Sequence, residues 1–64
     1  MSSAITSEEH RIIVLVAEGL KNSDIAETIG ATEDRVKNCL RRVYDKTGTW
    51  NRLELALWHA KEQS

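Results

Sequence analysis

Residues 19–46 read GLKNSDIAETIGATEDRVKNCLRRVYDK. Apolar residues recur at helical spacing over about 22–29 and again over about 33–47, and a short segment that contains Gly30 separates the two stretches. Gly30 can adopt the positive φ of a tight turn, and Thr32 is a suitable N-cap for the second stretch. A short helix, a tight turn and a longer helix form the helix-turn-helix motif. The segment therefore predicts this motif as the centre of the fold.

One further helix is expected on each side of the motif. Thr6 and Glu9 have the spacing of a capping box, which predicts the start of a helix over about 7–18. Asn51 is a suitable N-cap for a last helix that runs over about 52–62. The sequence therefore predicts an all-α, four-helix, helix-turn-helix fold. It forms a single domain over residues 1–64, with helices at about 7–18, 22–29, 33–47 and 52–62.

Composition limits the classes of protein to which the chain can belong. It has 64 residues and one cysteine, Cys39, so no internal disulfide forms, and a lone thiol is typical of reducing, cytoplasmic settings. Neither His10 nor His59 is spaced with Cys39 as metal ligands are. No catalytic Ser/His/Asp or Cys/His set can be placed, and no apolar run approaches the ~20 residues that span a membrane. We expect no enzyme, no metal, no cofactor, no small-molecule ligand and no membrane partner.

Cys39 itself allows two interpretations. As a small hydrophobe, it would lie half buried at the edge of the core. As a redox sensor, it would need a thiolate that Arg35 or Arg42 stabilises. We favour the first interpretation, because an unpaired cysteine on a helix is more often a packing residue than a reactive one.

Charge is distributed unevenly along the chain. The formal net charge is −1, but residues 35–52 hold six basic residues and one acidic residue, a net charge of +5. The three basic and nine acidic residues elsewhere give −6. A small domain polarised in this way can present one cationic face to phosphate groups and stay soluble through its remaining surface. The alternative is a solvated helix whose charge bias has no function, and charge alone does not decide between the two.

A helical wheel separates two faces of the third predicted helix. Its apolar side contains Val36, Leu40, Val43 and Thr47. Its opposite side contains Asp34, Asn38, Arg41, Arg42 and Asp45, with Lys37 and Arg35 on the flanks. We expect the first side to hold the helix in the domain and the second to offer hydrogen-bond donors outward. Arg and Lys can donate to O6 and N7 of guanine, and Asn can pair with adenine.

The last predicted helix has a core face and a contact face. The core face is expected to contain Leu53, Ala56, Leu57 and Ala60. Leu55 and Trp58 point elsewhere, and an exposed Trp beside a Leu is a candidate contact patch. Trp50 precedes this helix, and we expect it to pack against the core rather than to stack on a base.

Together these residues resemble the DNA-binding domain of the LuxR/GerE (NarL-type) bacterial transcription regulators. The resemblance covers about residues 5–60 without a gap and joins caps, core positions and basic positions. The matching positions are Ile5, Thr6, Glu9, Ile12, Ile13, Leu15, Val16, Ala17, Gly19, Leu20, Asn22, Ile25, Ala26, Ile29, Val36, Lys37, Leu40, Tyr44, Lys46, Gly48, Asn51, Arg52, Glu54, Leu55 and Ala56. The pattern fits a single-domain regulator and the C-terminal domain of a longer regulator equally well.

The resemblance implies that the third helix enters the major groove and that the fourth helix forms a dimer contact. It puts Lys37, Asn38 and Arg41 at base-reading positions. It puts Lys46 and Asn22 at positions that contact the DNA backbone. The other candidate DNA contacts are Arg35, Arg42 and Thr32, and the candidate dimerisation residues are Leu55, Trp58 and Glu62.

Several positions depart from the family pattern. Arg35 stands where Thr is common, Cys39 where His is common, and Thr47 where the residue is usually apolar. At the start of the first helix, residues 8–11 read EEHR where many members have Arg-Glu-x-Glu, an exchange that can alter an internal ion pair. These departures concern the affinity and the preferred DNA sequence more than the fold.

The sequence therefore predicts a bacterial transcription regulator that acts in the cytoplasm, at the nucleoid, and binds double-stranded DNA sequence-specifically as a homodimer. The alternative is a protein-interaction module that pairs with a larger LuxR-type regulator or with RNA polymerase and does not contact DNA itself. The patch of Leu55 and Trp58 and the absence of His at position 39 favour this alternative.

Overall fold

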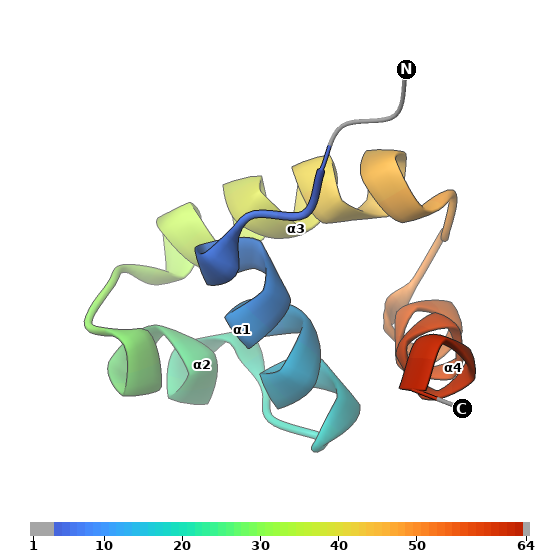
Figure 1. The fold of residues 1–64 in the computed structure, drawn as a ribbon. Coiled ribbons are helices and arrows are strands. Elements are labelled where there is room, and N and C mark those ends of the chain that lie inside the picture. The colour runs from blue at the N-terminus through green and yellow to red at the C-terminus, as the bar shows by residue number, and fades with distance from the viewer. Residues whose placement is uncertain (1–3, 64) are drawn as a thin grey trace.

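The computed structural model describes residues 4–63, with side chains for residues 4–62. Its helices are α1 (Ser7–Ala17), α2 (Asn22–Ile29), α3 (Glu33–Thr47) and α4 (Arg52–Gln63). The fold is therefore all-α, as the sequence predicts. In Figure 1, α1 lies between α2 and α4, and α3 crosses one side of the molecule from α2 towards α4. Among residues 4–63, no helix combines the length and the apolar composition needed to cross a membrane.

Side-chain caps begin three of the four helices. At α1, Thr6 N donates to Glu9 Oε1 at 2.9 Å and Glu9 N donates to Thr6 Oγ1 at 3.1 Å, so the capping box is complete. Thr32 Oγ1 accepts from Arg35 N at 3.1 Å before α3, and Asn51 Oδ1 accepts from Glu54 N at 2.9 Å before α4. Each cap satisfies a backbone N–H that the first helical turn leaves unpaired, so these three starts are encoded locally.

The start of α2 differs from the sequence-based expectation. Lys21, rather than Asn22, occupies the N-cap position, and no side chain caps the helix. Asn22 is the first helical residue, and its Oδ1 accepts a hydrogen bond from Arg52 Nη1 at 2.7 Å. Asn22 therefore joins α2 to the start of α4. Beyond α2, Gly30 has a φ of 71° in the helix-turn-helix turn, a left-handed conformation that favours glycine.

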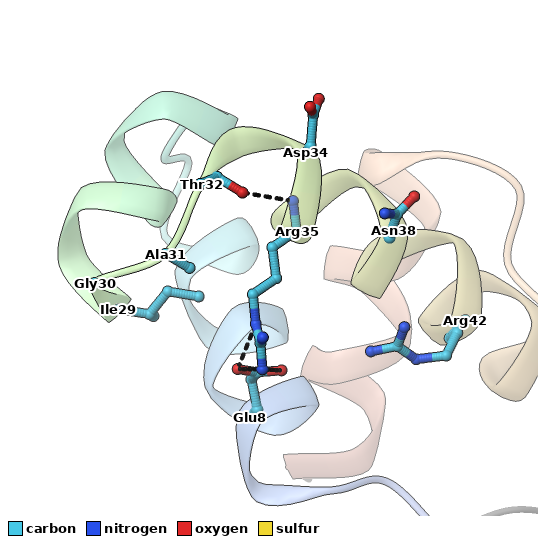
Figure 2. A pocket seen from close by; sticks show the side chains of 9 residues that line it. All are labelled: Glu8, Ile29, Gly30, Ala31, Thr32, Asp34, Arg35, Asn38 and Arg42. Carbon is cyan, nitrogen blue, oxygen red and sulfur yellow. Dashed lines mark hydrogen bonds and ion pairs between the residues drawn. The ribbon is translucent and has the colours of Figure 1, made fainter.

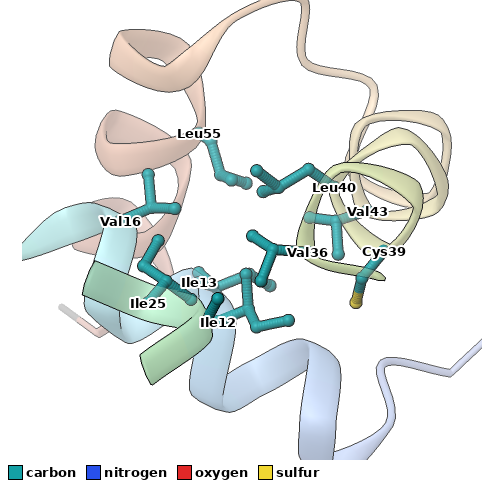
Figure 3. Packing of buried hydrophobic residues seen from close by; sticks show 10 residues of the cluster. Ile12, Ile13, Val16, Ile25, Val36, Cys39, Leu40, Val43 and Leu55 are labelled. Carbon is teal, nitrogen blue, oxygen red and sulfur yellow. The ribbon is translucent and has the colours of Figure 1, made fainter. Parts of the chain in front are cut away.

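A single hydrophobic core lies between the four helices (Figure 3). All four contribute buried side chains: Ile12, Ile13, Val16, Ile25, Ala26, Val36, Cys39, Leu40, Val43 and Leu55. The apolar side predicted for α3 is buried at Val36, Leu40 and Val43, so the helix is held in the orientation that the wheel indicates. This anchoring turns the opposite side of α3 outward.

The predicted faces of α4 are wrong. Leu55 is fully buried and Trp58 is half buried against the core, whereas Leu53 and Leu57 are 70% and 61% exposed. The reason is that α4 carries apolar residues on nearly all sides, so periodicity supports two different stripes. The packing of α4 against α1 selects the stripe that contains Leu55. Leu55 is therefore unavailable as a dimer contact.

Trp50 does not pack against the core, contrary to the prediction, and its side chain is 84% exposed. At α4 the core is instead covered by Leu55, which is buried, and by Trp58, which packs against it. The backbone of Trp50 is nevertheless held in place, because its N–H donates to Glu54 Oε1 at 2.7 Å. An exposed indole thus stands directly ahead of α4.

Cys39 is fully buried, deeper than the boundary position that the wheel predicts. Burial raises the pKa of its thiol, because a low-dielectric surrounding disfavours the charged thiolate. A redox sensor needs the opposite shift and solvent access. The structure therefore contradicts the redox interpretation and supports the small hydrophobe.

Candidate nucleic-acid interface

The outward side of α3 is the candidate site. Val36, Leu40 and Val43 anchor the helix, which leaves a strip of exposed polar side chains along its opposite surface. We call this strip the crest, and it consists of Asp34, Lys37, Asn38, Arg41 and Asp45. A well-anchored helix presents such side chains with little backbone freedom, which suits the recognition of a rigid partner.

Three further cations of α3 lie on the side that faces the start of α1. We call them the α1 flank, and they are Arg35, Arg42 and Lys46. Arg35 lies across Glu8, with Nε 3.2 Å and Nη2 3.0 Å from Glu8 Oε2. In Figure 2 its side chain points away from Asp34 and Asn38 and towards Glu8 on α1. The Arg35 guanidinium is thus engaged within the chain, although 63% of its side chain is exposed.

The other two flank cations meet at Glu9. The Glu9 carboxylate lies 2.7 Å from Lys46 Nζ and 3.4 Å from Arg42 Nε, and Glu9 is only 1% exposed. The Lys46 ammonium beside Glu9, with the hydrogen bond from Thr6 N, lowers the pKa of the Glu9 carboxyl from 4.5 to about 2. Lys46 also donates to the Ala4 carbonyl at 3.1 Å and is only 18% exposed. This cluster joins α1 to the C-terminal half of α3.

Arg52 is the sixth basic residue of the cationic segment, and it too is engaged. Its guanidinium donates to Asn22 Oδ1 at 2.7 Å and to the Leu20 carbonyl. It therefore connects α4 to the turn between α1 and α2. Arg52 counts toward the positive charge of residues 35–52, but its guanidinium is used to hold the helices together.

Only some of the six basic residues within 35–52 are thus available to a partner. Within the described part of the chain, Arg35, Arg42, Lys46 and Arg52 all make ion pairs or hydrogen bonds. Lys37 and Arg41 make none with residues 4–62. They stand four residues apart, about one turn of helix, and Asn38 lies between them in sequence. The crest therefore offers two free cations and one free carboxamide within one turn.

This arrangement has a defined recognition chemistry. Lys37 and Arg41 can donate to O6 and N7 of guanine, and Asn38 can form a bidentate pair with adenine. The same strip also carries the carboxylates of Asp34 and Asp45, which can accept from N4 of cytosine. The crest therefore has both signs of charge and little net charge. Such a surface is better suited to discriminating between base edges than to holding phosphates of any sequence.

The structure separates the predicted DNA contacts into two groups. Lys37, Asn38 and Arg41 are exposed together on the crest, as predicted. The other candidates are engaged within the chain. The two predicted contacts to the DNA backbone are occupied, since Lys46 pairs with Glu9 and the Asn22 side chain accepts from Arg52. Of the remaining candidates, the Thr32 hydroxyl caps α3, and Arg35 and Arg42 pair with glutamates of α1. The contribution of Glu8 and Glu9 was missed as a constraint on the site. The departure of residues 8–11 from the family pattern could have indicated it, because that departure places a glutamate at position 8, where it pairs with Arg35.

An open hollow of about 780 Å³ lies where the α1 flank meets the helix-turn-helix turn. Glu8, Arg35, Arg42 and Asn38 line it, together with Gly30, Ala31 and Thr32 of the turn (Figure 2). Its walls therefore contain residues of both the crest and the α1 flank.

Among the described residues, no three His, Cys, Asp or Glu side chains come together as a metal site would require. His10 and His59 do meet, with ring centroids 6.1 Å apart in an edge-on arrangement.

Comparison with known protein families identifies a match for this chain. The family model GerE, described as bacterial regulatory proteins of the luxR family, matches residues 3–59. The match includes α1, α2 and α3 and the part of α4 that contributes Leu55 to the core. No curated protein matches the chain.

Proposed function

The chain belongs to the luxR family of bacterial regulatory proteins, and from this premise we propose that it binds double-stranded DNA sequence-specifically by laying the crest of α3 in the major groove. Helix-turn-helix domains of this family bind DNA in transcription regulation and are not enzymes. The observation that carries the proposal is the pair of cations on the crest, Lys37 and Arg41, which have no partner among residues 4–62. Together with Asn38 they supply the donors that base edges accept.

In this proposal the helix-turn-helix acts as a rigid holder. The α3 helix has 15 residues, a length of about 22 Å, and a major groove about 12 Å wide admits a helix. Lys37, Asn38 and Arg41 reach the base edges, and Asp34 and Asp45 contribute by accepting from cytosine. Arg35 and Arg42 border the crest, but glutamates of α1 already pair with their guanidinium groups, so neither is given the role of binding flanking phosphates. Lys46 is excluded from this role, because its ammonium is occupied by Glu9.

A single crest offers few contacts, so useful affinity requires two copies on a repeated or inverted site. We propose that the chain forms a homodimer through the exposed side of α4. Leu53 and Leu57 take the place of Leu55 and Trp58 in this role, because they are 70% and 61% exposed and four residues apart on one face. Glu62 lies on the opposite side of α4 and is not included.

The dimer is tested by analytical ultracentrifugation of the pure protein and of Leu57→Glu. We expect the parent to sediment as a dimer and the variant as a monomer, since a buried carboxylate opposes association. The matched control is Glu62→Leu, on the other side of α4, which should remain dimeric. A parent that is monomeric at all concentrations would contradict the homodimer.

The DNA proposal is tested by fluorescence anisotropy with duplexes selected from a random library. Lys37→Ala and Arg41→Ala should each weaken binding about tenfold or more, the order of one lost base contact. The matched control is Arg11→Ala, because Arg11 is exposed on α1 and outside the crest, and its loss should change affinity little. No binding at low salt, or equal affinity in all four proteins, would contradict the proposal.

One observation favours a second function, in which the domain pairs with a larger LuxR-type regulator or with RNA polymerase. Trp50, Leu53 and Leu57 are each exposed, at and just before the first half of α4, and exposed aromatic side chains are typical anchors of protein interfaces. The same experiments discriminate. A protein that selects no duplex from the library and stays monomeric alone supports the second function.

A further inference from the structure

Trp50 is the most exposed large hydrophobic residue in the described part of the chain, at 84%. Hydrogen bonds fix the backbone on both sides of it. The backbone turns at Gly48, with a φ of 71°, and Thr49 N donates to the Tyr44 carbonyl at 3.1 Å. Thr49 Oγ1 lies 2.9 Å from Thr47 Oγ1, and Trp50 N donates a hydrogen bond to Glu54 Oε1. The indole is therefore held out into solvent by an ordered connection between α3 and α4.

The surface around Trp50 is continuous with the crest. An open hollow of about 490 Å³ is lined by Arg41, Tyr44, Asp45, Gly48, Thr49 and Trp50. Arg41 and Asp45 are also members of the crest, so the hollow begins where the crest ends. Two aromatic side chains and the Arg41 guanidinium thus share one surface. It lies at the C-terminal end of α3, away from the helix-turn-helix turn.

We infer that Trp50 is a further DNA-contacting residue, which packs its indole on a deoxyribose and donates its Nε1–H to the adjoining phosphate. The inference rests on the proposed function. The last residue of α3 lies six residues beyond Arg41, about 9 Å along the helix axis. A major groove is about 12 Å wide, so with Arg41 at the bases the end of α3 reaches the strand that borders the groove.

The chemistry of Trp50 suits this position. The indole Nε1–H is a donor only, and it has no acceptor among residues 4–62. A DNA phosphate is an acceptor, and a deoxyribose is an apolar surface of suitable size beside it. Contacts of this kind set the register of a protein on the duplex without reading sequence. Trp50 would fix how far α3 enters the groove, and Lys37, Asn38 and Arg41 would read the bases.

The test uses the intrinsic fluorescence of Trp50. The chain has two tryptophans, so Trp58→Phe leaves Trp50 as the only one and Trp50→Phe leaves Trp58. A selected duplex is added at low salt, and anisotropy of the labelled DNA is followed in the same titration. We expect Trp50 emission to shift and to saturate together with the anisotropy, and Trp58 emission to stay constant. Binding with unchanged Trp50 emission overturns the inference alone, and no binding by either variant or the parent overturns the proposed function as well.

A second measurement does not depend on the folding of Trp58→Phe. Trp50→Ala should weaken binding about fivefold, the order of one lost hydrogen bond with its packing, and leave thermal unfolding unchanged because the side chain is exposed. The salt dependence of its affinity should equal that of the parent, since no charge is removed. Unchanged affinity would overturn the inference. Trp50 emission that changes with protein concentration without DNA would also overturn it, and would place Trp50 between two protein chains.

Discussion

The crest and the α1 flank of α3 contain similar side chains in opposite situations. The flank cations Arg35, Arg42 and Lys46 all face carboxylates of α1. The crest cations Lys37 and Arg41 face solvent and have no partner within the described residues. Both sets belong to one helix and one stretch of sequence. The formal charge of α3 therefore overstates the charge that the helix can offer to a partner.

The ion pairs of the α1 flank differ in how far they are exposed to solvent. The pair of Arg35 and Glu8 is exposed, so water and salt screen it and its net contribution to stability is about 0–1 kcal/mol. The pair of Lys46 and Glu9 is enclosed, with 18% and 2% of the side chains exposed. A carboxylate buried in this way depends on its partners, because an unpaired buried charge is costly. Adjacent glutamates on α1 therefore differ in role. Glu9 holds α3 in place, and Glu8 neutralises Arg35 at the edge of the candidate site.

Removing the charge of Glu9 from the buried cluster should destabilise the domain strongly. Glu9→Gln should lower the free energy of unfolding by about 3 kcal/mol, because it leaves Lys46 without its counter-charge. For a domain of this size such a loss is a large fraction of the total stability. Urea unfolding followed by circular dichroism measures it. Glu8→Gln, one residue earlier, is the matched control and should change stability by less than about 1 kcal/mol; equal losses in the two variants would remove the distinction between them.

The same cluster predicts an acid transition. The pKa of the Glu9 carboxyl is about 2 in the folded protein and 4.5 in the unfolded reference, so the unfolded chain takes up the proton first. The stability that Glu9 contributes is therefore complete above pH 4.5 and is lost as pH falls from 4.5 towards 2. Urea unfolding at a series of pH values should show this decline. In Glu9→Gln the decline should be shallower, and an identical slope in the two proteins would rule out Glu9 as its source.

A matched pair of substitutions compares the two sides of α3 in DNA binding. Lys37→Gln should weaken binding to a selected duplex about tenfold, since it removes a free donor from the crest. Arg35→Gln should weaken it less than about twofold, because Glu8 already neutralises that guanidinium. Anisotropy titrations at one salt concentration measure both. A larger effect at position 35 would mean that the flank, rather than the crest, meets the DNA.

One substitution on α1 is expected to raise the affinity for DNA slightly. Glu8→Gln releases Arg35 beside the crest, so DNA affinity should rise about threefold, the order of one exposed ion pair. Because a released arginine can neutralise one phosphate, the slope of log K against log salt should steepen by about 0.9. Adding Arg35→Gln to this variant should abolish both changes. A gain that survives the second substitution would show that Glu8 acts on DNA directly and not through Arg35.

How much could be predicted from the sequence differs between α3 and α4. In α3 the apolar and charged residues alternate at helical spacing, so the buried side follows from the wheel, and the exposure of Lys37, Asn38 and Arg41 was predicted correctly. In α4 nearly every side is apolar, so the same reasoning selected Leu53 and Leu57 for the core, and it was wrong. Periodicity decides orientation only where the two faces differ in polarity.

The amino-acid sequence alone predicts the local features: the caps at Thr6, Thr32 and Asn51, the turn at Gly30, the all-α class and the family. These depend on neighbours within about four residues, or on patterns along the chain. Which cations of α3 remain unpaired depends instead on how the helices pack in three dimensions. The partners of Arg35, Arg42 and Lys46 lie 27, 33 and 37 residues away on α1, and no local pattern places them there. The available charge of the candidate site is a property of the packing, because ion pairing depends on distance in space and not in sequence.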